Sequence, residues 1–164
     1  MEIKKASKED IATIQHLAEV IWPEAYGKII SAAQLRYMLK LIYSKNALAA
    51  QIEKGHQFIL AIENNEAIGF ASFSQKNDIE PNTFRLHKIY VLPNVPTKGI
   101  GSLLLSYVCN ESIKQGATLL EFNVNKHNPA LQFYLKKGFA VLKDEVIDIG
   151  EGYVMDDYVM VKEL

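Results

Sequence analysis

The sequence contains one cysteine, Cys109, and carries almost no net charge. A lone cysteine excludes an internal disulfide and any zinc or iron–sulfur site built from several thiolates, and it favours a reducing compartment. The formal net charge of −1 offers no basic surplus that would attract nucleic acid or anionic lipid regardless of sequence. We therefore expect no metal cofactor, no nucleic-acid partner and a small-molecule ligand.

Long apolar runs, repeats and low-complexity tracts are also missing. No run approaches the roughly 20 residues that cross a bilayer, and the opening segment, MEIKKASKED, lacks the apolar stretch of a signal peptide. No linker-like stretch interrupts the 164 residues, of which 49% are hydrophobic and 23% are charged, as in ordinary globular domains. The sequence thus predicts a single cytoplasmic domain over residues 1–164, with no membrane partner.

The first third of the chain has the pattern of helices. A capping pattern that begins at Ser7 opens a helix, and Pro23 is expected to end it. A second capping pattern at Ser31 opens a helix with one apolar stripe, and a third helix is expected at about 47–54. Helices therefore precede most of the strands in this chain.

From His56 onward the pattern changes to strands separated by turns and by two helices. Asn64 and Asn65 tolerate the backbone of a tight hairpin, so the segment QFILAIENNEAIGFASFS predicts two antiparallel strands. Later elements are expected as strands over 83–92, 117–124, 139–147 and 153–161 and as helices over 99–115 and 129–137. The helix between the third and fourth strands implies that these two strands run parallel. The predicted fold class is α/β (α+β), with a single mixed, mostly antiparallel central sheet of about six to seven strands and helices on both faces.

The segment YVLPNVPTKGIGSLLL, residues 90–105, joins a strand to a helix through a loop that contains prolines and spaced glycines. The first N–H groups of such a helix attract an anion, and Gly99 and Gly101 leave room for a phosphate near the main chain. Lys98 adds a positive charge. Glycine and proline also occur in such turns for geometric reasons alone, so the loop by itself is a weak signal. Leu104 replaces the third glycine of a dinucleotide-binding motif, and no P-loop lysine motif is present.

Two motifs taken together resemble a known family. The segment IYVLPNVPTKGIGSLLL, followed by NVNKHNPALQFYLKKGF, is similar to the paired acetyl-coenzyme A signature of the GNAT N-acetyltransferase superfamily. The resemblance implies an enzyme with the GNAT fold that uses acetyl-coenzyme A as co-substrate. It would move the acetyl group to a primary amine of a small molecule or peptide by direct attack in a ternary complex.

The resemblance leaves the substrate and the assembly open. The chain looks like the branch of bacterial spermidine/spermine N-acetyltransferases, which makes a polyamine the first substrate to consider. The family acts on many other amines with the same framework, and a homodimer is common in it. The alternative function is a catalytically weak module of the same fold that binds and senses acyl-coenzyme A.

The resemblance also assigns residues to coenzyme A. A strand edge would pair with the pantetheine arm, and the loop with the first turn of the next helix would bind the pyrophosphate. Asn128 and Lys136 follow from the second motif, although a helix N-cap and a solvated helix lysine also explain these two residues. Pro96 departs from the family pattern because it has no main-chain N–H to donate. The coenzyme-binding set is Ile89, Tyr90, Val91, Thr97, Lys98, Gly99, Ile100, Gly101, Ser102, Asn128 and Lys136.

Two side chains are the candidate catalytic groups. By resemblance, Tyr134 supplies the proton that the leaving thiolate needs, and the alternative is a core tyrosine whose hydroxyl reaches the surface. His87 lies in the strand where relatives often carry a glutamate, and its ordinary pKa near ~6.5 suits a general base. A surface histidine without a catalytic duty explains His87 equally well. The main-chain N–H of Val91 is the family's donor to the developing oxyanion.

The acceptor pocket is expected to form from the first two helices and the last hairpin. The segment IWPEAY, read as a loop between helices, places Trp22 and Tyr26 where aromatic rings can line a pocket or stack on a cation. A helix–helix corner anchored by Trp22 is the alternative. Tyr153, from the last hairpin, is the third candidate. Acidic residues of this hairpin are either partners of a cationic amine or part of a solvated turn: Glu151, Asp156 and Asp157.

Overall fold

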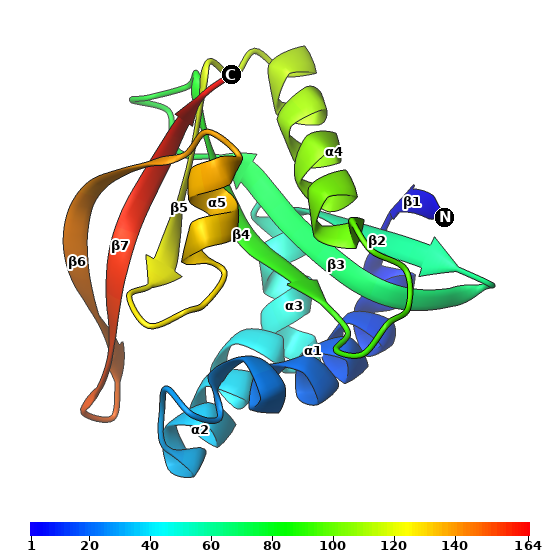
Figure 1. Ribbon diagram of the computed structural model, residues 1–164, viewed down its shortest axis with the longest axis vertical. Coiled ribbons are helices and arrows are strands. Elements are labelled where there is room, and N and C mark those ends of the chain that lie inside the picture. The colour runs from blue at the N-terminus through cyan, green and yellow to red at the C-terminus, as the bar shows by residue number, and fades with distance from the viewer.

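The computed structural model describes residues 1–164 and contains one sheet of seven strands (Figure 1). The strands are β1 (Glu2–Lys5), β2 (Gln57–Glu63), β3 (Glu66–Gln75), β4 (Thr83–Val91), β5 (Leu119–Asn125), β6 (Ala140–Gly150) and β7 (Tyr153–Glu163). Their spatial order is β1-β2-β3-β4-β5-β7-β6. Every neighbouring pair is antiparallel except β4 and β5, which run parallel. The predicted mixed, mostly antiparallel sheet is therefore confirmed.

Three helices cover one face of the sheet. A 3₁₀ turn leads into α1 (Ile11–Tyr26), which is followed by α2 (Ala32–Tyr43) and α3 (Lys45–Glu53). The predicted capping patterns at Ser7 and Ser31 both form. The helices pack on β2 and β3 through buried apolar side chains that include Ile14, Phe58 and Phe70. One continuous apolar layer thus joins α1, α2 and α3 to the sheet.

Pro23 lies inside α1 and does not end the helix, contrary to the expectation from sequence. The helix continues to Tyr26, and the Gly27 N–H donates to the Pro23 carbonyl at 3.0 Å. Trp22 and Tyr26 are therefore helical and almost fully buried, at 3% and 6% exposure, rather than on a loop. Proline removes one main-chain hydrogen bond, and the burial of two large aromatic rings beside it offsets that loss.

The helices α4 (Ile100–Lys114) and α5 (Leu131–Lys136) pack on the opposite face (Figure 1). The connection from β4 through α4 to β5 confirms the predicted parallel crossover. The helix α5 begins later than the predicted 129, because the Asn128 side chain accepts a hydrogen bond of 2.9 Å from the Ala130 N–H. Residues 128–130 consequently form a turn before the helix.

Short turns connect the hairpins of the sheet. Asn64 and Asn65 have φ of 51° and 65°, which confirms the predicted hairpin between β2 and β3. The last hairpin turns at residues 150–152, all with positive φ. The strand β1 was not predicted, because EIKK is short and charged, and it pairs with β2 through main-chain groups. No helix has both the length and the apolar character needed to cross a membrane.

Candidate active site

The sheet opens between β4 and β5. These strands pair at residues 83–85 of β4 and 119–121 of β5 and then diverge. The register of β4 against β3 shifts between Leu86 and Lys88, which makes His87 the extra residue of a β-bulge. A bulge bends its strand and increases the local twist. Beyond the paired stretch, the main-chain groups of β4 that face β5 therefore have no strand partner.

A cavity of about 30 Å³ occupies the gap between the diverging strands. Side chains reach it from both faces of the sheet, because Tyr26 belongs to the apolar layer of α1 and Tyr134 to that of α5. The gap thus brings together residues that the sequence assigned separately to acid, base, coenzyme and acceptor roles. Six of the predicted residues line it: Tyr26, His87, Ile89, Tyr90, Asn128 and Tyr134.

Tyr134 is held by aromatic packing on the α5 side of the cavity. Its ring lies edge-on to Phe122 of β5, with 4.4 Å between centroids, and to Phe139, with 6.0 Å between centroids. Burial raises the pKa of Tyr134, and the neighbouring Tyr26 adds to the rise. The hydroxyl therefore keeps its proton at neutral pH. A protonated phenol that lines the gap is suited to give a proton to a leaving group.

His87 lines the cavity, as expected, but its ring is already engaged. Its Nε2 lies 2.7 Å from the Ser74 hydroxyl, and its ring stacks on His56 with 3.9 Å between centroids. Burial lowers the pKa of His87 to about 3, and the charges of His56 and Lys88 contribute. A group with this pKa is neutral at pH 7 and accepts a proton weakly. The role of general base stays a prediction for His87, and its surroundings do not favour it.

Tyr26 and Tyr90 form the wall of the cavity on the α1 side. Their hydroxyls are 2.8 Å apart. Trp22 packs on Tyr26 with 4.6 Å between ring centroids and supports that ring without lining the cavity. Tyr153 does not line this cavity. It lies in a hollow between α2 and the β6–β7 hairpin, where its ring centroid is 5.3 Å from that of Tyr37. Of the three predicted acceptor residues, only Tyr26 reaches the cavity.

The N-terminus of α4 presents free main-chain donors. Gly99, with φ of 82°, precedes the helix, and no side chain caps it. The N–H groups of Ile100, Gly101 and Ser102 donate to no protein atom. Free N–H groups at the positive end of a helix dipole are suited to bind a phosphate. This geometry fits the phosphate-binding role predicted for the loop.

The other predicted coenzyme residues surround this helix start and the cavity. The Thr97 hydroxyl donates to the Glu63 carboxylate at 2.6 Å, which anchors the loop to the β2–β3 hairpin. Lys98 is exposed beside the free N–H groups, and Lys136 is exposed on α5. The side-chain Oδ1 of Asn128 accepts a hydrogen bond from the main-chain N–H of Ala130. The side-chain NH₂ group of Asn128 is therefore left for other contacts at the cavity.

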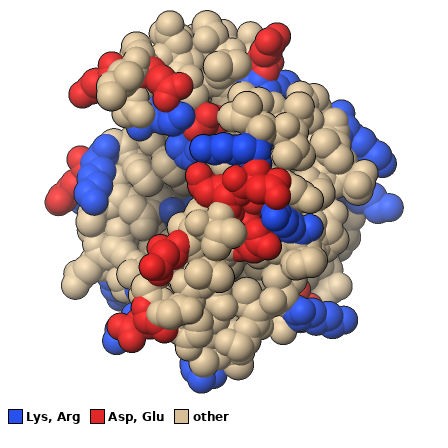
Figure 2. All heavy atoms as spheres, turned by 90° about the vertical axis from the view of Figure 1, so that its left-hand side faces the viewer, with Lys and Arg blue, Asp and Glu red and all other residues tan.

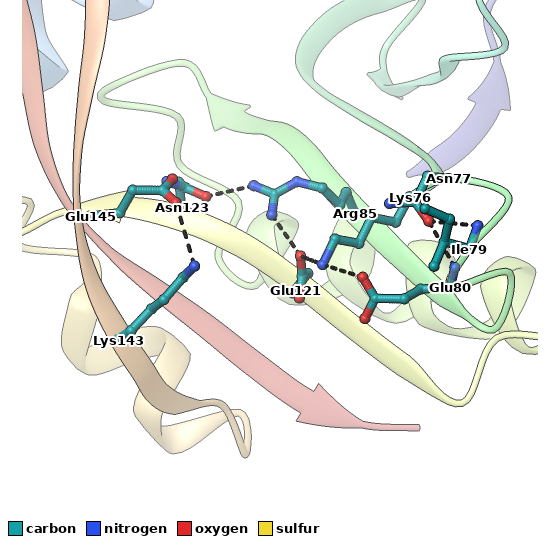
Figure 3. Close-up of polar contacts among 9 residues, drawn as sticks. All are labelled: Lys76, Asn77, Ile79, Glu80, Arg85, Glu121, Asn123, Lys143 and Glu145. Carbon is teal, nitrogen blue, oxygen red and sulfur yellow. Dashed lines mark hydrogen bonds and ion pairs between the residues drawn. The ribbon is translucent and has the colours of Figure 1, made fainter.

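A polar network crosses β4, β5 and β6 beside the cavity (Figure 3). Arg85 donates to the Glu121 carboxylate at 2.9 Å and also to the Asn123 side chain. Asn123, which lines the cavity, donates to Glu145 at 2.9 Å and to Asp157 at 3.3 Å. On the side of the molecule shown in Figure 2, acidic and basic side chains lie next to one another. Sequence reasoning gave Arg85 and Asn123 no role, although polar residues at alternate positions of β5 were an available signal.

Comparison with known families supports the motif resemblance. The sequence pattern of the acetyltransferase (GNAT) domain family matches residues 11–155. This range includes the diverging strands, the cavity and the N-terminus of α4. The chain belongs to this family. It is an N-acetyltransferase with the GNAT fold, and the resemblance drawn from two motifs is confirmed.

Known relatives of this GNAT acetyltransferase cover nearly its whole length. A spermidine N(1)-acetyltransferase of Thermoplasma acidophilum is 29% identical over 147 residues, which are 86% of this chain and 89% of that protein. The PaiA N-acetyltransferase from Thermoplasma acidophilum, solved in complex with coenzyme A, is similar with a TM-score of 0.83 and 27% identity, covering 99% of this chain and 98% of that one. An N-acetyltransferase from Staphylococcus aureus shares the fold, with a TM-score of 0.73 and 23% identity over 99% and 97% of the two chains.

Proposed function

We propose that this GNAT acetyltransferase moves the acetyl group of acetyl-coenzyme A onto a primary amine of a small molecule or peptide, by direct attack with both substrates bound. The gap between β4 and β5 carries the proposal, because side chains from both faces of the sheet meet in it. A covalent acyl-enzyme is not needed. The one cysteine, Cys109, lies outside the cavity, and burial raises the pKa of its thiol.

The residues present fit coenzyme A. The free N–H groups of residues 100–102 suit the pyrophosphate, and Lys98 adds positive charge beside them. The unpaired edge of β4 at residues 89–91 suits the pantetheine arm, which can pair with a strand edge. When bound, the coenzyme supplies an acetyl thioester. Pro96 lacks an N–H, so we expect this loop to bind with one donor fewer than is usual in the family.

The reaction requires a proton donor for the leaving thiolate, a hydrogen-bond donor for the oxygen that becomes negative, and a base for the amine. Tyr134 is the proposed acid that protonates the leaving thiolate. The main-chain N–H of Val91 is the proposed donor to the oxygen that becomes negative. An alkyl amine with an ordinary pKa near ~10.4 is protonated at neutral pH, so a base has to remove a proton before attack. His87, whose pKa is lowered to about 3, suits that task poorly.

Thiol release in the presence of a panel of amines tests the proposal. Purified protein is mixed with acetyl-coenzyme A and with spermidine, spermine, free amino acids or a short peptide, and the free thiol is measured by its colour reaction. The relative that is a spermidine acetyltransferase, at 29% identity, makes spermidine the first amine to try. Amine-dependent release supports the proposed function. Coenzyme binding without release by any amine supports the sensing module instead.

Gly99→Val is expected to weaken coenzyme A binding by about tenfold, since a β-branched residue in the left-handed region costs roughly 1–2 kcal/mol and displaces the first turn of α4. Titration calorimetry with coenzyme A measures the affinity. Gly116→Val is a matched control, because Gly116 lies at the other end of α4 with φ of 95° against 82° for Gly99. At both glycines the space around an added Cβ is open. We expect equal strain but unchanged affinity in the control, and wild-type affinity in Gly99→Val would refute the assigned role.

A further inference from the structure

Asp157 of β7 is a buried carboxylate with one oxygen that no donor contacts. The residue is 5% exposed, and its Oδ2 accepts a hydrogen bond of 3.3 Å from the Asn123 side chain. Its Oδ1 is buried and has no hydrogen-bond partner. A carboxylate oxygen removed from water without a donor destabilises the fold, so its presence calls for a functional explanation.

Asp157 lies directly behind Asn123, on the acceptor side of the cavity, and is not itself one of the residues that line it. Met155, two residues earlier on β7, packs in the apolar layer of α1 and α2, so Asp157 points to that same face of the sheet. The charge of Asp157 acts on the hydroxyl of Tyr26, and both Tyr26 and Asn123 line the cavity. Tyr134 enters the cavity from the opposite face. The carboxylate and the proposed acid therefore lie on opposite sides of the gap.

The two acidic neighbours of Asp157 each have a cation of their own, because Lys143 lies 3.8 Å from Glu145 and Lys126 lies 3.0 Å from Asp156. Glu145 faces Asp157 from β6, and Asp156 adjoins it on β7. Arg85 is the cation that acts on it from β4, and that guanidinium is already bonded within the network of Figure 3. On the helix side, the titratable group that faces it is the Tyr26 hydroxyl. Asp157 itself forms no ion pair, so a ligand that brings a positive charge would balance the charge of this carboxylate.

The proton affinity of the carboxylate is consistent with this position. Burial raises the pKa of Asp157 above its ordinary value, and the charges of Glu145 and Asp156 add to the rise. The hydrogen bond from Asn123 and the charge of Arg85 oppose it. A carboxylate with a raised pKa is a stronger proton acceptor than an ordinary one.

We propose that Asp157 binds the protonated amine of the acceptor through its free Oδ1 and takes a proton from it, a role that rests on the proposed function and gives that reaction a base. His87 has a nitrogen held at 2.7 Å by Ser74, whereas the Oδ1 of Asp157 has no hydrogen-bond partner.

Protons and bonds balance in this scheme. The ammonium gives one proton to Asp157 and becomes an amine with a free electron pair. That pair forms the C–N bond to the acetyl carbon, and the C–S bond of the thioester breaks. The thiolate takes the proton of Tyr134, and the second proton of the nitrogen restores Tyr134. Asp157 then releases its proton to water, so one proton leaves for each acetyl group transferred.

Asp157→Asn tests the role, because it keeps the size of the side chain and removes its charge. We expect kcat/KM for spermidine, or for the fastest amine of the panel, to fall at least about 100-fold. Asp157 has to be ionised to act, so the acidic limb of kcat/KM against pH should disappear in the variant. The affinity for coenzyme A should stay unchanged in calorimetry. Asp144→Asn is the control, because the Asp144 carboxylate on β6 is 68% exposed and pairs with Lys126 at the surface.

The free protein provides a readout that needs no substrate. A pKa raised in the folded state means that folding favours the neutral carboxyl, so Asp157 destabilises the fold increasingly as pH rises through its folded pKa. We expect Asp157→Asn to melt at a higher temperature than the wild type at neutral pH. The difference should vanish as pH falls toward the ordinary pKa of aspartate, near ~3.9. A lower Tm of the variant at neutral pH would indicate a structural carboxylate and overturn the proposal.

The kinetic outcomes separate this role from the proposed function. Absence of amine-dependent thiol release by the wild type would refute the proposed function and the role together. Equal release by the wild type and Asp157→Asn would refute the role alone. A slow variant that retains the wild-type acidic limb would overturn the assignment of Asp157 as the base.

Discussion

Tyr134→Phe is expected to lower kcat by about 100-fold or more, because one positioned general acid contributes about that much rate. The substitution removes the hydroxyl and keeps the ring that packs on Phe122 and Phe139, so the fold should persist. The free N–H groups proposed to bind the pyrophosphate lie at the start of α4 and are not altered. The loss should therefore appear in turnover and not in the affinity for coenzyme A.

Thiol-release assays at saturating acetyl-coenzyme A, combined with calorimetry, measure the two quantities separately. Tyr107→Phe is the control, because it removes a hydroxyl from α4 outside the cavity, and it should turn over at the wild-type rate. Wild-type kcat in Tyr134→Phe would remove Tyr134 from the acid role. A drop in coenzyme affinity as large as the drop in kcat would make it a binding residue instead.

Phe70→Ala is expected to lower the free energy of unfolding by about 3–5 kcal/mol, the range for truncating a buried phenylalanine. Phe70 of β3 is fully buried, and its ring contacts Tyr43 at 6.0 Å and Tyr90 at 5.7 Å between centroids. Both neighbours are anchored at their own positions, Tyr43 at the end of α2 and Tyr90 in β4, so they cannot close the space that the ring leaves.

Urea denaturation of the wild type and the variant measures this loss. Leu142→Ala provides the contrast, because Leu142 lies on the edge strand β6 and is 57% exposed. We expect the contrast variant to stay within about 0.5 kcal/mol of the wild type, as surface substitutions usually do. A change of similar size in both variants would contradict the view that the aromatic layer between the sheet and α1–α3 dominates stability.

Features set by neighbouring residues could be predicted from the sequence. The hairpin at Asn64 and Asn65 and the cap at Ser31 depend on a few adjacent side chains, and both form as expected. The end of α1 could not be predicted in this way, because contacts distant in the chain decide whether a helix passes through Pro23. The same holds for β1, whose four residues form a strand only because β2 offers them a partner.

In the candidate site, too, the features set by adjacent residues could be predicted from the sequence, and those set by distant contacts could not. Two local motifs were enough to single out Tyr134 and the loop before α4 as candidates, and their roles stay predictions. The gap depends on the bulge at His87 and on the pairing of β5 with β7, which are long-range features. The sequence also left Asp156 and Asp157 equivalent. Once the strand is placed, the Asp156 side chain is 49% exposed and pairs with Lys126, whereas Asp157 is 5% exposed.

The divergence of β4 from β5 also bears on how the protein avoids sticking to copies of itself. A bare strand at the rim of a sheet is a template for aggregation, because another molecule's strand can add to it. Here the bare stretch of β4 lies inside the sheet, between β3 and β5, with α5 beside it. A second folded chain therefore cannot add a strand to it from the rim of the sheet. The unpaired groups of β4, to which we assign the pantetheine arm, thus lie away from the outer strands of the sheet, where self-association would begin.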